Sequence, residues 1–123
     1  MDRIRASFAS EALRRRLAAD GSAQLRVQGR SMAPLFREGD VVEIRPLSPL
    51  EDLSGLIIAV DLGDRVAVHR SIGLGRPTIQ THGIACAHLD PPLPRSAGIG
   101  VVARHGRRDE GQLARAAGWA LMA

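Results

Sequence analysis

The stretch that decides the fold is Val27–Val42, with the sequence VQGRSMAPLFREGDVV. An alternating run leads into it, and a second apolar run begins after the turn dipeptide Gly39-Asp40. Between the two runs, Pro34 has a fixed φ and favours extended geometry in the residue before it. We therefore expect Ser31 to lie on a constrained loop between two strands, where a nucleophile can be presented while neighbouring N–H groups stay free.

The chain around this stretch has the pattern of several short strands. Strands are expected at residues 23–27, 41–44, 56–60, 66–72, 78–81 and 99–103. The segment 56–60 is apolar on both faces, which is typical of a central strand. Turns containing Gly or Pro separate the strands, and residues 82–96 are expected to be irregular. The pattern predicts a mainly β protein built as a small antiparallel domain.

A helix is expected at each end of this β core, which spans residues 23–103 of a single domain covering 1–123. In the N-terminal helix, at residues 3–19 within the segment 1–20, the inward side chains would be Ile4, Phe8, Ala12, Leu13 and Leu17. Ser7 or Ser10 could cap this helix. Its arginines, Arg14–Arg16, form either an ordinary wet face or a basic surface for an acidic peptide or a membrane. The C-terminal helix is expected over residues 109–122, with Asp109 as its N-cap.

The composition restricts the chemistry that Ser31 can take part in. The chain has 123 residues, 45% of them hydrophobic, and a net charge of +4. Its 17 positively charged side chains are all arginines, so no lysine is present. A Ser-Lys dyad is therefore excluded, and any base for Ser31 must be a histidine or a carboxylate.

The cysteine count and the hydropathy indicate a compartment. Cys86 is the only cysteine, which excludes an intrachain disulfide and is compatible with a reducing environment. No apolar run approaches the roughly 18–20 residues that span a bilayer, and the charged N-terminus lacks the apolar core of a signal peptide. We expect a cytoplasmic protein without a cofactor, and peripheral membrane contact and the oligomeric state stay open.

Four segments, in order, resemble the boxes of one peptidase clan. They are G-x-S-M-x-P followed by G-D (residues 29–40), RVAVHRSIG (65–73), THGI with a later aspartate (81–90) and GIGVV (98–102). Together they resemble type I signal peptidases and LexA-like self-cleaving repressors. The V-H-R context of His69 is similar to the endoplasmic-reticulum type of signal peptidase, whose base is a histidine. The resemblance covers about Val27 to Val102 and implies the coiled, barrel-like all-β fold of the signal peptidase catalytic domain.

The resemblance also implies roles for particular residues. Ser31 would be the nucleophile, His69 the general base, and Asp90 the carboxylate that orients the imidazole. A histidine suits this role because its ordinary pKa lies near working pH. Asp61 and Asp64, in the turn before the histidine strand, are alternatives for the carboxylate.

The oxyanion would be met by backbone N–H groups at the serine. The donors would be the N–H of Ser31 and that of Arg30, with Gly29 in support and Met32 as a core or pocket-wall residue. Gly29 occupies the position where many signal peptidases have a second serine whose hydroxyl helps here. Without that hydroxyl we expect a site slower by about 10²-fold. THGI (residues 81–84) resembles the T-K-G-D box of the clan, and Ile84 stands where that box has an aspartate.

The predicted function is that of a serine endopeptidase which removes a leader or maturation segment from a peptide or protein. The substrate would bind extended, with small residues near the cleavage site. A non-catalytic peptide-binding module of the same fold is the alternative.

Two further functions have weaker support. His82, Cys86, His88 and Asp90 are all metal-ligand types, but their spacing is not a familiar zinc pattern, and we predict no metal. Cys86 would be a nucleophile only with a depressed pKa. The isoelectric point near 11.1 and the arginine clusters invite nucleic-acid binding. The modest net charge, the scarce aromatic residues and the lack of a recognisable binding motif argue against it.

Overall fold

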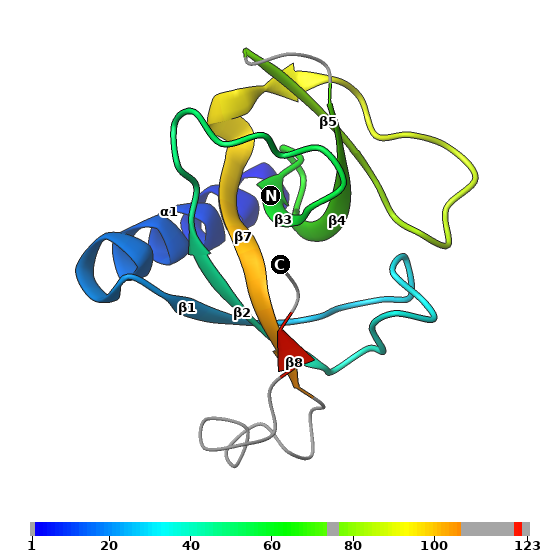
Figure 1. The fold of residues 1–123 in the computed structure, drawn as a ribbon, viewed down its shortest axis with the longest axis horizontal. Coiled ribbons are helices and arrows are strands. Elements are labelled where there is room, and N and C mark those ends of the chain that lie inside the picture. The colour runs from blue at the N-terminus through cyan, green and yellow to red at the C-terminus, as the bar shows by residue number, and fades with distance from the viewer. Residues whose placement is uncertain (1, 74–76, 107–119, 122–123) are drawn as a thin grey trace.

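The computed structural model describes residues 2–73, 77–106 and 120–121, and it is mainly β, as predicted. Helix α1 (Asp2–Asp20) comes first (Figure 1). The strands are β1 (Ala23–Arg26), β2 (Val41–Pro46), β3 (Ile57–Asp61), β4 (Val66–Gly73), β5 (Thr78–His82), β6 (Leu93–Pro94), β7 (Gly98–Gly106) and β8 (Ala120–Leu121). A 3-10 turn, η1 (Arg95–Ala97), joins β6 to β7.

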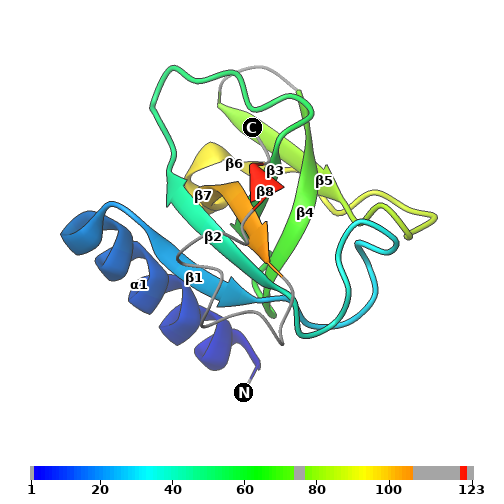
Figure 2. The same cartoon turned by 60° about the horizontal axis from the view of Figure 1, so that its bottom comes forward.

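The strands form one antiparallel sheet that curls on itself (Figure 2). Its order is β1-β2-β7-β3-β4-β5-β6, with β8 paired to β7. The predicted central strand is confirmed, because β3 lies between β7 and β4 and is buried from Ile57 to Val60. Register shifts at Glu43/Ile44 and Ala59/Val60 mark irregularities that increase local bend and twist. The two faces of the curled sheet carry separate hydrophobic clusters, one around Phe36 and Ile44 and one around Ile58 and Val101.

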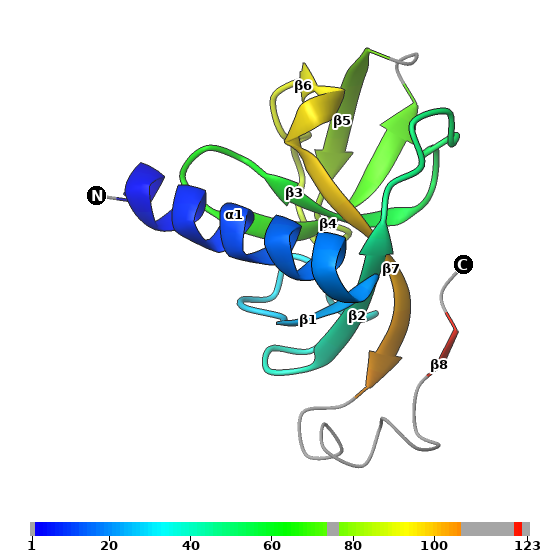
Figure 3. The same ribbon diagram turned by 90° about the vertical axis from the view of Figure 1, so that its left-hand side faces the viewer.

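Helix α1 crosses the strands and covers one of these clusters (Figure 3). Leu17 is buried there, with Leu13 packed beside it. A Cβ on Gly100 of β7 would lie 3.3 Å from Leu17 Cδ1 and 2.7 Å from the carbonyl oxygen of Arg45. Only glycine therefore lets the helix and the neighbouring strand approach β7 this closely.

The predicted inward face of α1 is partly wrong. Phe8 is 69% exposed and Ala12 is also exposed. Among the side chains of α1 that the structure describes, the buried ones are instead Ser10 and Leu17, and Arg14, although exposed, donates to the carbonyl of Ser96 at 2.8 Å. Ser10 does not cap the helix, because it lies buried in the middle and accepts a hydrogen bond from Arg14 Nε at 3.1 Å.

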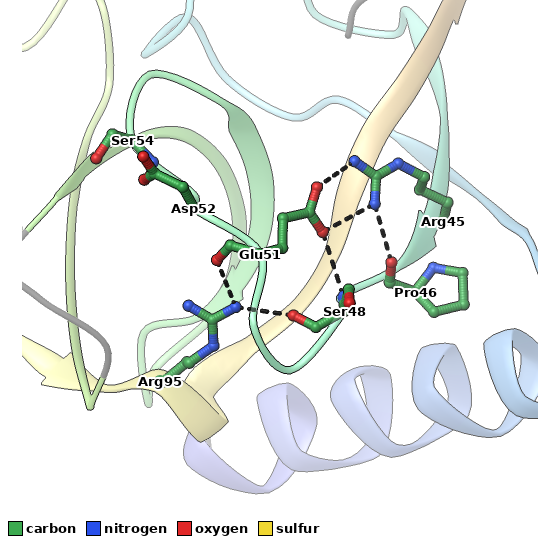
Figure 4. Close-up of polar contacts among 7 residues, drawn as sticks. All are labelled: Arg45, Pro46, Ser48, Glu51, Asp52, Ser54 and Arg95. Atoms are coloured by element: carbon green, nitrogen blue, oxygen red, sulfur yellow. Dashed lines mark hydrogen bonds and ion pairs between the residues drawn. The ribbon is translucent and has the colours of Figure 1, made fainter.

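The long loop between β2 and β3 is held by a polar network (Figure 4). The carboxylate of Glu51 accepts two hydrogen bonds from the Arg45 guanidinium, at 3.0 and 2.5 Å. Arg95 donates to the carbonyls of Ser48 and Glu51, both at 2.9 Å. The hydrogen bonds from Arg45 lower the pKa of Glu51, and the same contact raises the pKa of Arg45. The network thus ties β2 and η1 to this loop.

Two other predictions about secondary structure need correction or stay open. The segment expected to be irregular contains β6 and η1. Residues 109–119 of the expected C-terminal helix lie outside the described residues. At Ala120 and Leu121 the chain is a strand, not a helix, because these residues pair with His105 and Arg104 of β7. Among the described residues, no helix has the length and apolarity to cross a membrane.

Candidate active site

The loop between β1 and β2 carries Ser31. Two backbone hydrogen bonds join the ends of this loop. Val27 N–H donates to the Asp40 carbonyl at 2.7 Å, and Gly39 N–H donates to the Val27 carbonyl at 2.8 Å. Met32 and Phe36 anchor it in the hydrophobic core, where both are almost fully buried. Ser31 directly precedes the Met32 anchor, which holds this part of the loop in place, and Ser31 itself stays partly exposed.

The far end of the same loop is fixed by a buried carboxylate. Asp40 Oδ2 accepts hydrogen bonds from Arg37 N–H at 2.9 Å and from His105 Nε2 at 3.0 Å. Burial alone raises the pKa of Asp40, but the hydrogen bonds from Arg37 and His105 outweigh it and the net shift is downward. The Ser31 loop is thereby attached to β7, which carries His105.

His69 lies on β4 with only 1% of its surface exposed. Its Nε2 is 3.0 Å from Ser31 Oγ, and its Nδ1 is 2.6 Å from Asp90 Oδ2. Because an ionised carboxylate only accepts, Nδ1 carries the proton in the neutral imidazole. Nε2 is then free to accept the proton of the Ser31 hydroxyl. Three residues far apart in the sequence therefore form a continuous Ser-His-Asp relay.

The loop between β5 and β6 carries Asp90. In Figures 1 and 2 this loop and the Ser31 loop project from the same side of the sheet. They touch directly, because Ala85 N–H donates to the carbonyl oxygen of Ser31 at 2.8 Å. A Cβ on Gly83 would lie 2.6 Å from that same oxygen. Gly83 is therefore needed for the two loops to meet this closely.

The alternative carboxylates do not reach the imidazole. Asp61 Oδ1 accepts from Gly63 N–H at 2.8 Å, and Asp64 lies 3.4 Å from Arg65. Both contacts hold these carboxylates at the turn between β3 and β4, so Asp90 alone of the three candidates bonds His69.

The four side chains of metal-ligand type, His82, Cys86, His88 and Asp90, do not come together as a cluster. Over residues 2–73, 77–106 and 120–121, no group of three or more His, Cys, Asp or Glu side chains is placed to hold a metal ion. His82 Nδ1 lies 3.2 Å from the Gly83 carbonyl, while Cys86 and His88 are exposed. Asp90 Oδ2 is hydrogen-bonded to His69 Nδ1 instead.

The support residues around Ser31 differ in what they can offer. Within the described part of the chain, no hydrogen bond uses the N–H of Arg30 or Ser31, so neither group is committed to another acceptor. Met32 is 1% exposed and lies in the core, which agrees with the prediction of a core residue, and it does not line the groove beside Ser31. Gly29 has φ +77°, the left-handed region that favours glycine. Ile84 is partly buried against the core cluster, so its side chain serves packing.

A groove of about 380 Å³ opens beside the serine and the histidine. It lies between the end of β1 and the first half of β4, and α1 contributes Ala9. Side chains along it include Leu25, Val27, Ser31, Val66, Val68 and His69. β1 is an edge strand, and β5 pairs with β4 only from Arg70 onward. Residues 66–69 of β4 therefore have one edge without a strand partner among the described strands.

Three residues of this site received no role in the sequence analysis: Gln80, Thr81 and Gly83. Thr81 Oγ1 donates to Asp90 Oδ2 at 2.7 Å, and Gln80 Nε2 donates to the Asp90 carbonyl at 3.0 Å. A signal for Thr81 was present, because alternation from Ile79 places its hydroxyl on the buried face, where it needs a partner. Gly83 carried no such signal.

Comparison with models of known protein families gives no match, and no curated protein matches the chain. A functional assignment therefore depends on the geometry of the site.

Proposed function

We propose that this protein is a serine endopeptidase that cleaves a leader or maturation segment from a peptide or protein. The observation that carries the proposal is the relay of Ser31 Oγ, His69 and Asp90, with distances of 3.0 and 2.6 Å. These separations are within the range expected of a nucleophile, its base and an orienting carboxylate. His69 is also almost fully buried, so its ring has few alternative positions.

The proposed chemistry starts with proton transfer from Ser31 Oγ to His69 Nε2 as the hydroxyl attacks a peptide carbonyl. The N–H groups of Ser31 and Arg30 stabilise the resulting oxyanion. The imidazolium then gives its proton to the leaving amine, which leaves an acyl-enzyme ester at Ser31. Water, activated by the same imidazole, releases the acid and restores the hydroxyl. Asp90 stays ionised throughout and holds the Nδ1–H tautomer.

We propose that the substrate binds in the groove in an extended conformation. Over residues 66–69, β4 has an edge that no described strand pairs with, and this edge offers backbone groups to a peptide that adds as a strand. Apolar side chains such as Val66 and Val68 line the groove. We propose small side chains next to the cleaved bond, as the resemblance implies; Ser31 and His69 line the groove at this point.

The fold supports the resemblance to signal peptidases and LexA-like repressors at the level of a curled antiparallel sheet. We propose that the sheet is the catalytic domain of that clan, in the variant whose base is histidine. Helix α1 packs on the sheet as an addition to that domain.

A cleavage assay tests the proposal. Purified protein is incubated with a diverse peptide library, and new peptide termini are identified by mass spectrometry. We expect cleavage after small residues that is lost in Ser31→Ala and in His69→Ala. Ser96→Ala, an exposed serine outside the groove, is the matched control and should cleave like the wild type.

The second candidate is a peptide-binding module, favoured by the absence of a hydroxyl at Gly29 and of an acid at Ile84. The same library distinguishes the two. If the protein retains peptides but never cuts them, and Ser31→Ala retains them equally well, the binding module is the correct function and the peptidase proposal is wrong.

A further inference from the structure

Asp90 depends on its neighbours for its position, because it lies on a loop and not on a strand. Three hydrogen bonds attach it to β5. Its N–H donates to the Thr81 carbonyl at 2.8 Å, its carbonyl accepts from Gln80 Nε2 at 3.0 Å, and its carboxylate accepts from Thr81 Oγ1 at 2.7 Å. The first two bonds fix the backbone of Asp90, and only the third fixes the carboxylate.

The hydrogen bond from Thr81 Oγ1 is placed so that it can orient the Asp90 carboxylate toward His69. Thr81 Oγ1 and His69 Nδ1 both donate to the same oxygen, Asp90 Oδ2. Thr81 is 2% exposed, so water does not easily replace its hydroxyl. The pairing of β4 with β5 sets Thr81 opposite Ser71, two residues beyond His69 on the same face of β4. The sheet thus places the hydroxyl and the imidazole around one carboxylate oxygen.

We propose that Thr81 is a positioning residue, whose hydroxyl holds the Asp90 carboxylate in the orientation that keeps the proton of His69 on Nδ1. The inference rests on the proposed peptidase function, and it adds a residue to which no role was given. Without the hydroxyl, the carboxylate can rotate about its own side-chain bonds, and both tautomers of His69 become populated. Only the tautomer with a free Nε2 can accept the proton of Ser31.

The expected cost is a loss in kcat of about 10- to 100-fold in Thr81→Val, the range for removing one hydrogen bond to a charged group. KM should stay close to the wild-type value, because Thr81 does not line the groove. Thr81→Ser keeps the donor and should restore most of the rate. If Thr81→Val does not fold, Thr81→Ala serves as the second donor-free variant.

Ser71→Ala is a matched control. Ser71 is as buried as Thr81 and lies directly opposite it, but its hydroxyl has no hydrogen-bond partner among the described residues. Removing it deletes a buried hydroxyl at the same place in the sheet without touching Asp90. Kinetics equal to the wild type are expected, whereas a loss as large as that of Thr81→Val would mean that the defect is a general disturbance of β4 and β5 and would overturn the proposal.

A readout that does not depend on activity separates this inference from the peptidase proposal. The ¹⁵N chemical shifts of the His69 ring, measured above the pH at which it is protonated, report the fraction of each tautomer. We expect a single Nδ1–H tautomer in the wild type, in Thr81→Ser and in Ser71→Ala, and a mixture in Thr81→Val. An unchanged tautomer in Thr81→Val would overturn the role of Thr81 even if the protein cleaves peptides. If Thr81→Val shows a mixture of His69 tautomers but the wild type cleaves no peptide, the positioning role of Thr81 is upheld and the peptidase proposal is wrong.

Discussion

Gly83 lies against Ser31 so closely that a Cβ on Gly83 would be 2.6 Å from the Ser31 carbonyl oxygen and 2.7 Å from its Cβ. The first of these atoms belongs to the backbone and cannot rotate away. The glycine between β5 and the Asp90 loop therefore sets the position of the nucleophile on another loop. The contact couples the two loops that carry the outer members of the relay, and it gives the first prediction.

Gly83→Ala should displace Ser31 from His69. Because a misplacement near 1 Å can cost about 10²-fold in rate, we expect a loss of that order in kcat. The overpacking should also lower the free energy of unfolding by about 1–3 kcal/mol. Gly98→Ala is the control for overpacking away from the site, since its Cβ would meet Leu47 Cδ1 at 2.8 Å and the Arg95 carbonyl oxygen at 3.3 Å. Steady-state kinetics and denaturant unfolding measure both effects, and full activity in Gly83→Ala would contradict the coupling.

Cys86 offers a chemical test of the same contact. Its Sγ lies 2.8 Å from the point where a Gly83 Cβ would be, and the residue is exposed. A bulky adduct should therefore stand over Ser31 and obstruct the substrate. We expect N-ethylmaleimide to reduce peptide cleavage by about 10-fold or more. Cys86→Ser should be active and insensitive to the reagent. Stoichiometric labelling of the wild type, shown by intact mass, with no loss of rate would refute this placement.

Gly29 gives a prediction about the oxyanion site. The space around its Cβ position is open, but φ is +77°, so a side chain costs backbone strain of about 1–2 kcal/mol. Gly29→Ser and Gly29→Ala carry the same strain and should be equally destabilised in denaturant unfolding. If a hydroxyl here assists the oxyanion, the serine variant should turn over up to about 10²-fold faster than the alanine variant. Equal rates in the two variants would show that the hydroxyl does not reach the oxyanion.

The stability of the fold should depend on acid pH through Glu51 and Asp40. Both carboxyls have a folded-state pKa below their ordinary values, so the unfolded chain binds more protons as the pH falls. The stability they contribute is full above the unfolded pKa values, about 4.3 for Glu and 3.9 for Asp, and is lost as the pH falls through the lower folded values.

Glu51→Gln tests this dependence. At neutral pH it should lower the free energy of unfolding by about 1–3 kcal/mol, because Arg45 loses its charged partner. The difference from the wild type should shrink as the pH falls below about 4. Asp64→Asn is the control, since its contact with Arg65 is largely exposed, and it should change stability by less than about 0.5 kcal/mol. Urea titrations over this pH range provide the measurement, and a constant difference between Glu51→Gln and the wild type would contradict the linkage.

The sequence by itself determined most of the strands and the chemistry that is available. Alternation of apolar residues along a strand reports a local property, so β1 to β5 and β7 could be predicted within a few residues of their ends. The absence of lysine left only a histidine or a carboxylate to serve as the base for Ser31. The order of the boxes then singled out His69 and Asp90.

The tertiary structure decided which of these groups meet. The resemblance favoured Asp90 over the alternatives Asp61 and Asp64, but only the folding of the β5–β6 loop onto the Ser31 loop brings Asp90 to His69. The role of Gly83, the hydrogen bond from Thr81 and the orientation of α1 that exposes Phe8 all depend on contacts between distant segments. Such contacts leave no periodic trace in the sequence, because strand pairing and loop packing join residues whose separation along the chain is arbitrary.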